Sequence, residues 1–302
     1  MTLEDSRLTP HLEARWENYW LCYKQGKRFF ERGHYTAALA CFDRAILVRP
    51  NDYWSLYHRA NTLVELGEFE RAIDSFDKAL DERPRDYWAW YNRGVVLSEE
   101  MGEFERAIAS FDKALRLRPH DYWAWFRRGD ALRYLQEYRA ALSCYEEALD
   151  NRPSDFWSWF RKGDCLRHLG KLEESEIAYR EALKNEPDDF DTRYKLAELY
   201  RIQGDYRSAI AQYDACLDLE PEDTYSWYNQ ACCAVLDNDL DGAMRSLAKA
   251  VELAPEIYVP LAMDDLELKP LWKRSDFHRL MQFVRRNVRG LDGIDEGRSR
   301  RL

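Results

Sequence analysis

The chain has 302 residues, 46% of them hydrophobic and 33% charged, so it can bury a large core and still present a charged surface. Its net charge of −10 argues against a general nucleic-acid-binding protein, because neutralising phosphate groups requires a basic surface. No run of about 18 apolar residues is present, so no membrane-spanning helix is expected.

The N-terminal segment predicts a helix and no leader. The stretch MTLEDSRLTPHLEARW lacks the charged-then-apolar pattern of a secretory signal peptide. Residues 1–8 are expected to be disordered. Thr9 and Pro10 predict a helix start, because a hydroxyl N-cap precedes a proline at the first helical position. This helix should extend to Arg32 and stop at Gly33. Seven cysteines, an odd number, indicate reduced thiols and a cytoplasmic protein.

A proline recurs at a nearly constant interval along most of the chain. The successive separations are 34, 35, 34, 34, 34 and 34 residues. Self-similarity at a fixed period predicts a solenoid in which each unit stacks on its neighbours, and not two globular domains. The prolines are Pro50, Pro84, Pro119, Pro153, Pro187, Pro221 and Pro255.

Each unit predicts two helices joined by a short turn. An aspartate after the proline can cap the first helix. A glycine at the turn can adopt the left-handed conformation that ends this helix, and the next proline ends the second helix. The capping aspartates are Asp52, Asp86, Asp121, Asp155, Asp189 and Asp223. The turn glycines are Gly67, Gly102, Gly170 and Gly204.

Small and aromatic residues recur inside the unit. Position 8 is glycine or alanine, position 20 is alanine or serine, position 24 is aromatic or leucine, and position 27 is alanine or cysteine, as in Gly129, Ala141, Tyr145 and Ala148. This pattern resembles the tetratricopeptide repeat. The resemblance implies an all-α fold, a right-handed superhelical solenoid of tandem helix pairs with helical end caps.

The repeat register defines the expected domain organisation. Residues 1–18 form an N-terminal segment with the start of the first helix, and residues 19–257 form seven repeats. Closing helices are expected over residues 258–288, and a basic, flexible tail over 289–302. The repeats are expected at about residues 19–52, 53–86, 87–121, 122–155, 156–189, 190–223 and 224–257. One extra residue falls near Glu99–Met101, and Arg193 replaces a large apolar residue in repeat six.

No constellation predicts catalysis, a cofactor or a metal. The six histidines form no cluster with carboxylates, and no glycine-rich phosphate loop is present. Cys165 and His168 could supply two ligands, but a zinc site needs three or four. The sequence therefore indicates a protein that is not an enzyme.

The resemblance implies that the first helices line a concave groove, with positions 2, 5, 6, 9, 12 and 13 facing it. Aromatic residues recur at positions 2 and 5. They predict a ladder that binds a partner, because exposed aromatic rows mark binding surfaces. The alternative is that each tryptophan packs against the neighbouring repeat as a rigid staple. The aromatic groove residues are Trp20, Trp54, Trp88, Trp123, Trp157, Tyr57, Tyr91, Phe126, Phe160 and Tyr194.

Positions 6, 9 and 12 change character along the array. Asn61 and Asn92 provide amides in the early repeats. Six cations stand against three acids in repeats four to six, which suggests a ligand with acidic groups. A lattice of salt bridges between repeats is the alternative. The cations are Arg127, Arg133, Arg161, Arg167, Lys195 and Arg201.

These features predict a non-enzymatic scaffold or adaptor that binds a partner protein or peptide with acidic and apolar residues. One alternative is an assembly or regulatory factor for a multiprotein, possibly membrane-associated, complex. Others are an accessory domain of an enzyme, a chaperone-binding carboxylate clamp and an RNA-binding repeat protein. No DNA partner is expected, and the sequence leaves the partner's identity and the oligomeric state open.

Overall fold

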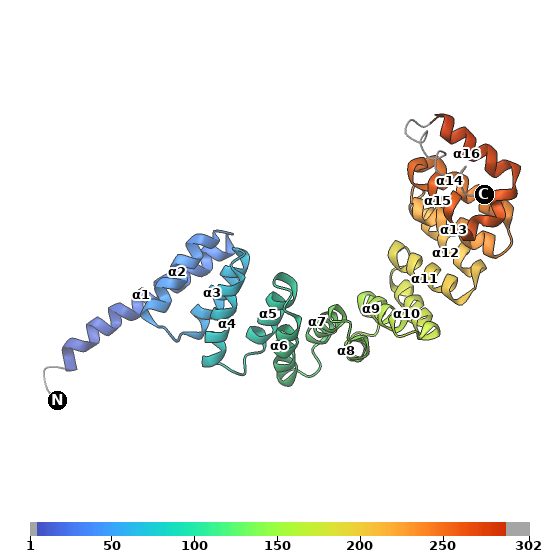
Figure 1. Cartoon of the computed structure of the whole chain (residues 1–302). Helices are drawn as coiled ribbons and strands as arrows, with labels where there is room; N and C mark the ends of the chain where they lie inside the picture. Colours follow the sequence, from blue (N-terminus) through green and yellow to red (C-terminus); the bar gives the residue numbers. More distant parts are fainter. Residues whose placement is uncertain (1–4, 288–302) are drawn as a thin grey trace. The chain divides into compact units, whose positions relative to one another are not determined.

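The computed structural model describes residues 5–287, which form sixteen α-helices, one π-helical segment and one 3-10 segment (Figure 1). The predicted all-α fold is confirmed, since the described residues contain no strand and successive helices pack as pairs. The chain divides into two compact units, residues 1–153 and 154–302.

Unit 1 contains the first four repeats. Its helices are α1 (Asp5–Glu31), α2 (Tyr35–Val48), α3 (Tyr53–Glu65), α4 (Phe69–Glu82), α5 (Tyr87–Val95), the π segment η1 (Val96–Glu100), α6 (Phe104–Leu117), α7 (Tyr122–Tyr134) and α8 (Tyr138–Asn151). Helices α1, α3, α5 and α7 are the first helices of their repeats, and each packs on the helix that follows it.

Unit 2 contains the last three repeats and the closing elements. Its helices are α9 (Phe156–His168), α10 (Leu172–Asn185), α11 (Phe190–Gln203), α12 (Tyr206–Leu219), α13 (Thr224–Leu236), α14 (Leu240–Leu253), α15 (Pro255–Asp264), the 3-10 segment η2 (Leu266–Lys273) and α16 (Ser275–Asn287). The first helices are α9, α11 and α13.

The predicted aspartate caps are present at every repeat after the first. The Asp52 carboxylate accepts a hydrogen bond from the Ser55 N–H at 2.8 Å, and Asp189 accepts from the Thr192 N–H at 2.7 Å. Such a cap satisfies a backbone donor that the first turn leaves unpaired, and it contributes about 1 kcal/mol. The remaining caps are Asp86, Asp121, Asp155 and Asp223.

The turns between paired helices use a left-handed residue, as predicted. Gly204 has φ +80° and Gly67 has φ +73°. In repeats four and seven the same conformation falls on Gln136 at φ 61° and Asn238 at φ 65°. A side chain is tolerated there at some cost in backbone strain, more readily for asparagine than for glutamine.

Position 8 is small because the aromatic residue at position 24 lies directly against it. A Cβ added at Gly163 would lie 2.7 Å from Cδ1 of Tyr179, and one at Gly94 would lie 2.7 Å from Cε1 of Phe111. Both aromatic rings are fully buried. These contacts bring the two helices of a repeat together at the predicted positions.

The extra residue in repeat three is accommodated by η1. A π turn absorbs one additional residue without ending the helix, because its hydrogen bonds span five residues instead of four. The Met101 N–H bonds to the Val96 carbonyl at 3.2 Å in this way. Val96 and Leu97 remain buried, so the insertion leaves the packing side of the helix in place.

The N-terminal expectation needs a correction, because α1 begins at Asp5 and not at Pro10. Pro10 is therefore the sixth residue of α1, where its missing N–H removes one backbone hydrogen bond. At the other end of the array, α15, η2 and α16 cover the last repeat. Phe277 and Met281 of α16 are buried in a core shared with α13 and α14. The predicted basic tail lies outside the described residues.

Replacing Ala148 with leucine should lower the free energy of unfolding by about 1–3 kcal/mol, because Ala148 is completely buried and three added carbons must displace neighbours. Denaturant unfolding followed by circular dichroism measures this loss. Ser143→Leu on the exposed side of the same helix is the control. A loss below about 0.3 kcal/mol at Ala148, well short of that overpacking cost, would contradict the assigned packing.

Candidate partner-binding face

In each unit the first helices share a set of recurrent positions, here called the A face and made of positions 2, 5, 6, 9, 12 and 13 of each repeat. The tryptophans at position 2 are about half exposed, from 44% for Trp54 to 51% for Trp88 and Trp157. By contrast, Tyr53 and Ser55, the neighbours of Trp54 in the sequence, are buried. Trp20, Trp54, Trp88 and Trp123 belong to unit 1, and Trp157 belongs to unit 2.

An arginine of the same repeat supports three of these five indoles, those of Trp54, Trp88 and Trp123. The Trp54 ring meets Tyr53 edge-on with centroids 5.0 Å apart, and the Arg83 guanidinium lies 4.5 Å from the Tyr53 centroid and 5.2 Å from Trp54. Such a contact stabilises an exposed aromatic group by about 0.5–1 kcal/mol. The same trio recurs as Tyr87, Trp88 and Arg118, and as Tyr122, Trp123 and Arg152.

The link from one repeat to the next is made by the tyrosine before the tryptophan. Tyr19 donates its hydroxyl proton to the Asp52 carboxylate at 2.8 Å, and Asp52 caps the next repeat. Burial and this hydrogen bond raise the pKa of Tyr19 to about 12. The tyrosine therefore orders the repeats, while the tryptophan beside it keeps exposed surface.

Position 5 divides between surface and core. Phe126 and Phe160 are each only 8% exposed, so they contribute little to an apolar wall on the A face. Tyr57 and Tyr194 are half-buried and carry hydroxyl groups. Asn92 donates to the Tyr57 hydroxyl at 2.9 Å, so this predicted site amide already bridges two repeats. Asn92 also approaches Asn61 Oδ1 at 3.5 Å. Tyr91, the position-5 residue of repeat three, is half-buried.

In repeat four of unit 1 the two A-face arginines have acidic partners. Arg127 forms an ion pair with Glu99 of the π segment. Arg133 Nε lies 3.8 Å from Asp130, and Asp130 also accepts a hydrogen bond from Tyr145 at 2.8 Å. The sequence did not suggest Glu99 as the partner of Arg127.

In unit 2 the pattern continues with a further partner from the closing elements. Lys195 lies 3.3 Å from Glu198, and Arg161 lies 3.8 Å from Asp164. Arg201 donates to both carboxylate oxygens of Glu267 in η2 at 2.7 Å. The cationic surplus predicted for the A face is thus partly neutralised from elsewhere in the chain.

Several A-face arginines keep an unused donor. The Nε atoms of Arg127, Arg133, Arg167 and Arg201 are buried and have no hydrogen-bond partner among the described residues. A buried donor without a partner costs about 1–3 kcal/mol, and such groups are uncommon in folded proteins.

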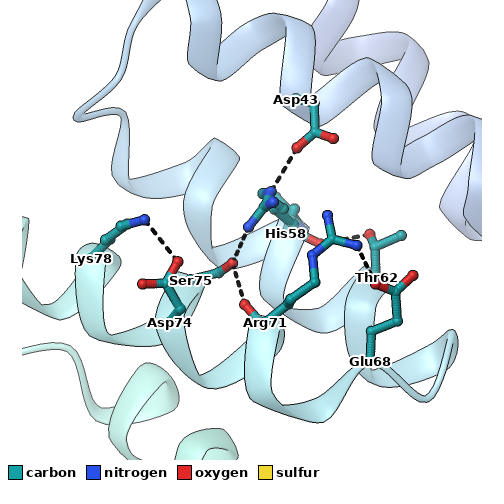
Figure 2. Close-up of polar contacts among 9 residues, drawn as sticks. Asp43, His58, Thr62, Glu68, Arg71, Asp74, Ser75 and Lys78 are labelled. Carbon is teal, nitrogen blue, oxygen red and sulfur yellow. Dashed lines mark hydrogen bonds and ion pairs between the residues drawn. The ribbon is translucent and has the colours of Figure 1, made fainter.

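A second arginine row, at position 7, holds the repeats together and was missed in the sequence. Arg59 donates from Nε to Asp43 at 2.6 Å and from Nη1 to Ser75 at 2.5 Å. Figure 2 shows Asp43 and Ser75 on the two sides of this contact, on α2 and α4. Arg93 repeats it with Asp77 and Ser110, and Arg128 repeats it with Asp112 and with Cys144 in place of the serine. The recurrence of an aspartate 16 residues before each arginine was the available signal.

Arg193, the unusual residue of repeat six, takes over the role of a tryptophan. Its Nε donates to the Pro187 carbonyl at 2.9 Å. In other repeats an indole N–H makes this bond, and the pairs are Trp90 with Pro84, Trp125 with Pro119, and Trp227 with Pro221. The substitution therefore preserves the contact between the helix and the preceding loop.

One group of possible metal ligands lies among the described residues, formed by Cys232, Asp265 and Glu267. Its acids are already engaged, because Tyr228 donates to Asp265 at 2.6 Å and Arg201 binds Glu267. Burial, followed by the charge of Asp265, raises the pKa of the Cys232 thiol, which disfavours the thiolate that a metal requires. The group fits an internal polar contact better than a metal site.

The family is established by comparison with known proteins. The tetratricopeptide repeat model matches residues 23–86, 57–122, 98–133, 126–190 and 194–256. These matches span most of the chain, which therefore belongs to the tetratricopeptide repeat family. No curated protein sequence matches it significantly. Within the described residues, no helix is both long and apolar enough to cross a membrane.

Solved structures share the fold at low sequence identity. The C-terminal part of a repeat protein from Cytophaga hutchinsonii is 13% identical, with a TM-score of 0.69 over 81% of this chain and 100% of that one. YrrB, described as a tetratricopeptide repeat protein with an unusual peptide-binding site, is 23% identical, with a TM-score of 0.57 over 64% and 100%. MamA from Desulfovibrio magneticus is 24% identical, with a TM-score of 0.54 over 57% and 97%.

Proposed function

We propose that the chain is a non-enzymatic scaffold or adaptor that holds an extended or helical segment of a partner protein on its A face. Tetratricopeptide repeat proteins are generally scaffolds for protein interactions and typically lack enzymatic activity. The observation that carries the proposal is the half-exposed indole at position 2 in five successive repeats. Large aromatic groups left exposed in a row are the usual anchors of a protein interface.

The chemistry of the A face indicates the kind of partner. The indoles would cover apolar side chains. In Trp54, Trp88 and Trp123 a supporting arginine restricts the ring orientation, which lowers the entropy lost on binding. The A-face arginines, which stay partly exposed, would bind acidic side chains through charge-assisted hydrogen bonds. A partner segment in which acidic and apolar residues alternate satisfies both requirements.

Replacing Trp123 and Trp157 with alanine should weaken partner binding by at least about 2 kcal/mol, or about 30-fold, because buried tryptophans dominate interface energies. Proteins captured from the source cell by the wild-type chain would be identified and then titrated against both forms. Leu47→Ala with Ile177→Ala is the matched control, since both side chains are exposed on second helices. Equal affinity of the tryptophan variant and the wild type would contradict the proposal.

A further inference from the structure

The closing elements of unit 2 place an acidic segment on the A face of repeats six and seven. Asp265 accepts a hydrogen bond from the hydroxyl of Tyr228, at position 5 of repeat seven, at 2.6 Å. Glu267 accepts from Arg201, at position 12 of repeat six, at 2.7 Å. Leu266 between them is 74% exposed. The chain itself thus shows how two A-face residues hold an acid-x-acid segment.

The same pair of residues occurs one repeat earlier. Arg167 is at position 12 of repeat five and Tyr194 is at position 5 of repeat six, each 34 residues before its counterpart. Both side chains are half-buried. The Nε of Arg167 is buried without a partner, and its guanidinium lies beside the Tyr179 hydroxyl.

The Tyr194 hydroxyl can donate a hydrogen bond to a ligand. Its hydroxyl oxygen accepts a hydrogen bond from Asn229 at 2.7 Å, so the hydroxyl proton is left for another acceptor. Burial, followed by the charge of Glu198, raises the pKa of Tyr194 to about 12, which keeps the hydroxyl protonated at neutral pH. Tyr228 uses the equivalent proton for Asp265.

The site at Arg167 and Tyr194 has one additional cation and one additional anion compared with the site at Arg201 and Tyr228. Lys195 occupies the position of Asn229, and Glu198 occupies the position of Cys232. Lys195 and Glu198 lie 3.3 Å apart and offset each other. Asp164, which accepts a hydrogen bond from the Tyr179 hydroxyl beside Arg167, lies 3.8 Å from Arg161. The pair does not occur earlier in the array, because position 12 of repeats one to three is Phe30, Val64 or Ser98, and Arg133 of repeat four is followed by Phe160, which has no hydroxyl.

We propose that Arg167 and Tyr194 form a binding site for a partner segment that carries two acidic residues separated by one exposed residue. The first acid accepts from the Tyr194 hydroxyl, and the second accepts from the Arg167 guanidinium, as Asp265 and Glu267 do one repeat later. This inference rests on the proposed function and gives the partner its recognition chemistry. The closing elements occupy the site formed by Arg201 and Tyr228, so the partner would bind the site formed by Arg167 and Tyr194.

The test uses the protein's own acidic segment as the probe. A fluorescein-labelled peptide of residues 263–270, MDDLELKP, is titrated into the full chain at low salt and followed by fluorescence anisotropy. We expect saturable binding that weakens about tenfold in Arg167→Gln, because a hydrogen bond to a charged group is lost. Tyr194→Phe should weaken binding a few-fold, and a peptide with glutamine in place of Glu267 about tenfold.

Two controls make the outcome decisive. Arg207→Gln, on an exposed side chain of α12, should leave peptide binding unchanged, and circular dichroism checks that each variant is folded. Peptide binding that is insensitive to Arg167→Gln, or absent, overturns the site. Loss of binding in Arg201→Gln but not in Arg167→Gln also overturns it, because the peptide would then have displaced the closing segment.

The site and the proposed function fail in different ways. If the peptide depends on Arg167 but the captured partner is insensitive to the tryptophan substitutions, the acid-pair site stands and the scaffold proposal is wrong. If the captured partner needs Trp157 but the peptide does not bind, the scaffold proposal stands and the acid-pair site is wrong.

Discussion

Replacing Phe111 with alanine should lower the free energy of unfolding by about 3–5 kcal/mol, the largest stability loss expected for a single core substitution here. Phe111 is completely buried, and its ring lies against Gly94 and 6.0 Å from the ring of Tyr91. Neither glycine nor a tyrosine fixed in its own helix can fill the space that the ring leaves. The variant therefore retains a cavity where the two helices of repeat three meet.

Unfolding of the variant should begin in repeat three and then spread, because each repeat contacts mainly its neighbours. Hydrogen exchange should show α5 and α6 losing protection first, and urea unfolding should give the total change. Ile177→Ala, at a side chain 60% exposed on α10, is the control and should change stability by less than about 0.5 kcal/mol. Similar losses in the two variants would contradict the packing described for position 24.

The fold was predictable because its determinants are local and repeated. The aspartate caps act over three residues, and Gly204 ends its helix within one turn. The contact between Gly163 and Tyr179 lies inside a single repeat. A sequence that repeats such short-range signals seven times specifies its helix pairs without knowledge of distant contacts. The start of α1 was misplaced because it precedes the repeat register.

The candidate site was predictable only in part, because its pairings reach outside the repeat. The exposure of Trp54 follows from its register position, but the partner of Arg127 depends on where the π turn places Glu99. The partner of Arg201 comes from η2, which has no repeat equivalent. Position 5 lies between face and core, so the sequence could not show that Phe160 is buried.

Reversing the charges of Arg161 and Lys195 to glutamate should weaken partner binding by about 2–5 kcal/mol while the chain stays folded, since cations on a binding face steer and pair with an acidic partner. Each substitution places an acid three residues from an existing one, Asp164 or Glu198. That repulsion costs less than about 1 kcal/mol on partly exposed helix positions. Titration calorimetry with the captured partner and a thermal melt measure the two effects separately.

The control keeps the change in net charge and the local repulsion the same. Lys184→Glu with Lys249→Glu also places each new acid three residues from an old one, but on the second helices α10 and α14. This control should retain partner affinity. Its melting temperature should lie slightly above that of the first variant, because Arg161 also lies over the rings of Trp157 and Phe160, at 5.9 and 5.5 Å. Binding to the wild type should weaken as salt rises, because exposed charges are screened over about 8 Å at physiological ionic strength. If the A-face cations only form salt bridges between repeats, the result should be the reverse. The melting temperature should then fall clearly in the A-face variant alone, and its affinity for the partner should equal that of the wild type.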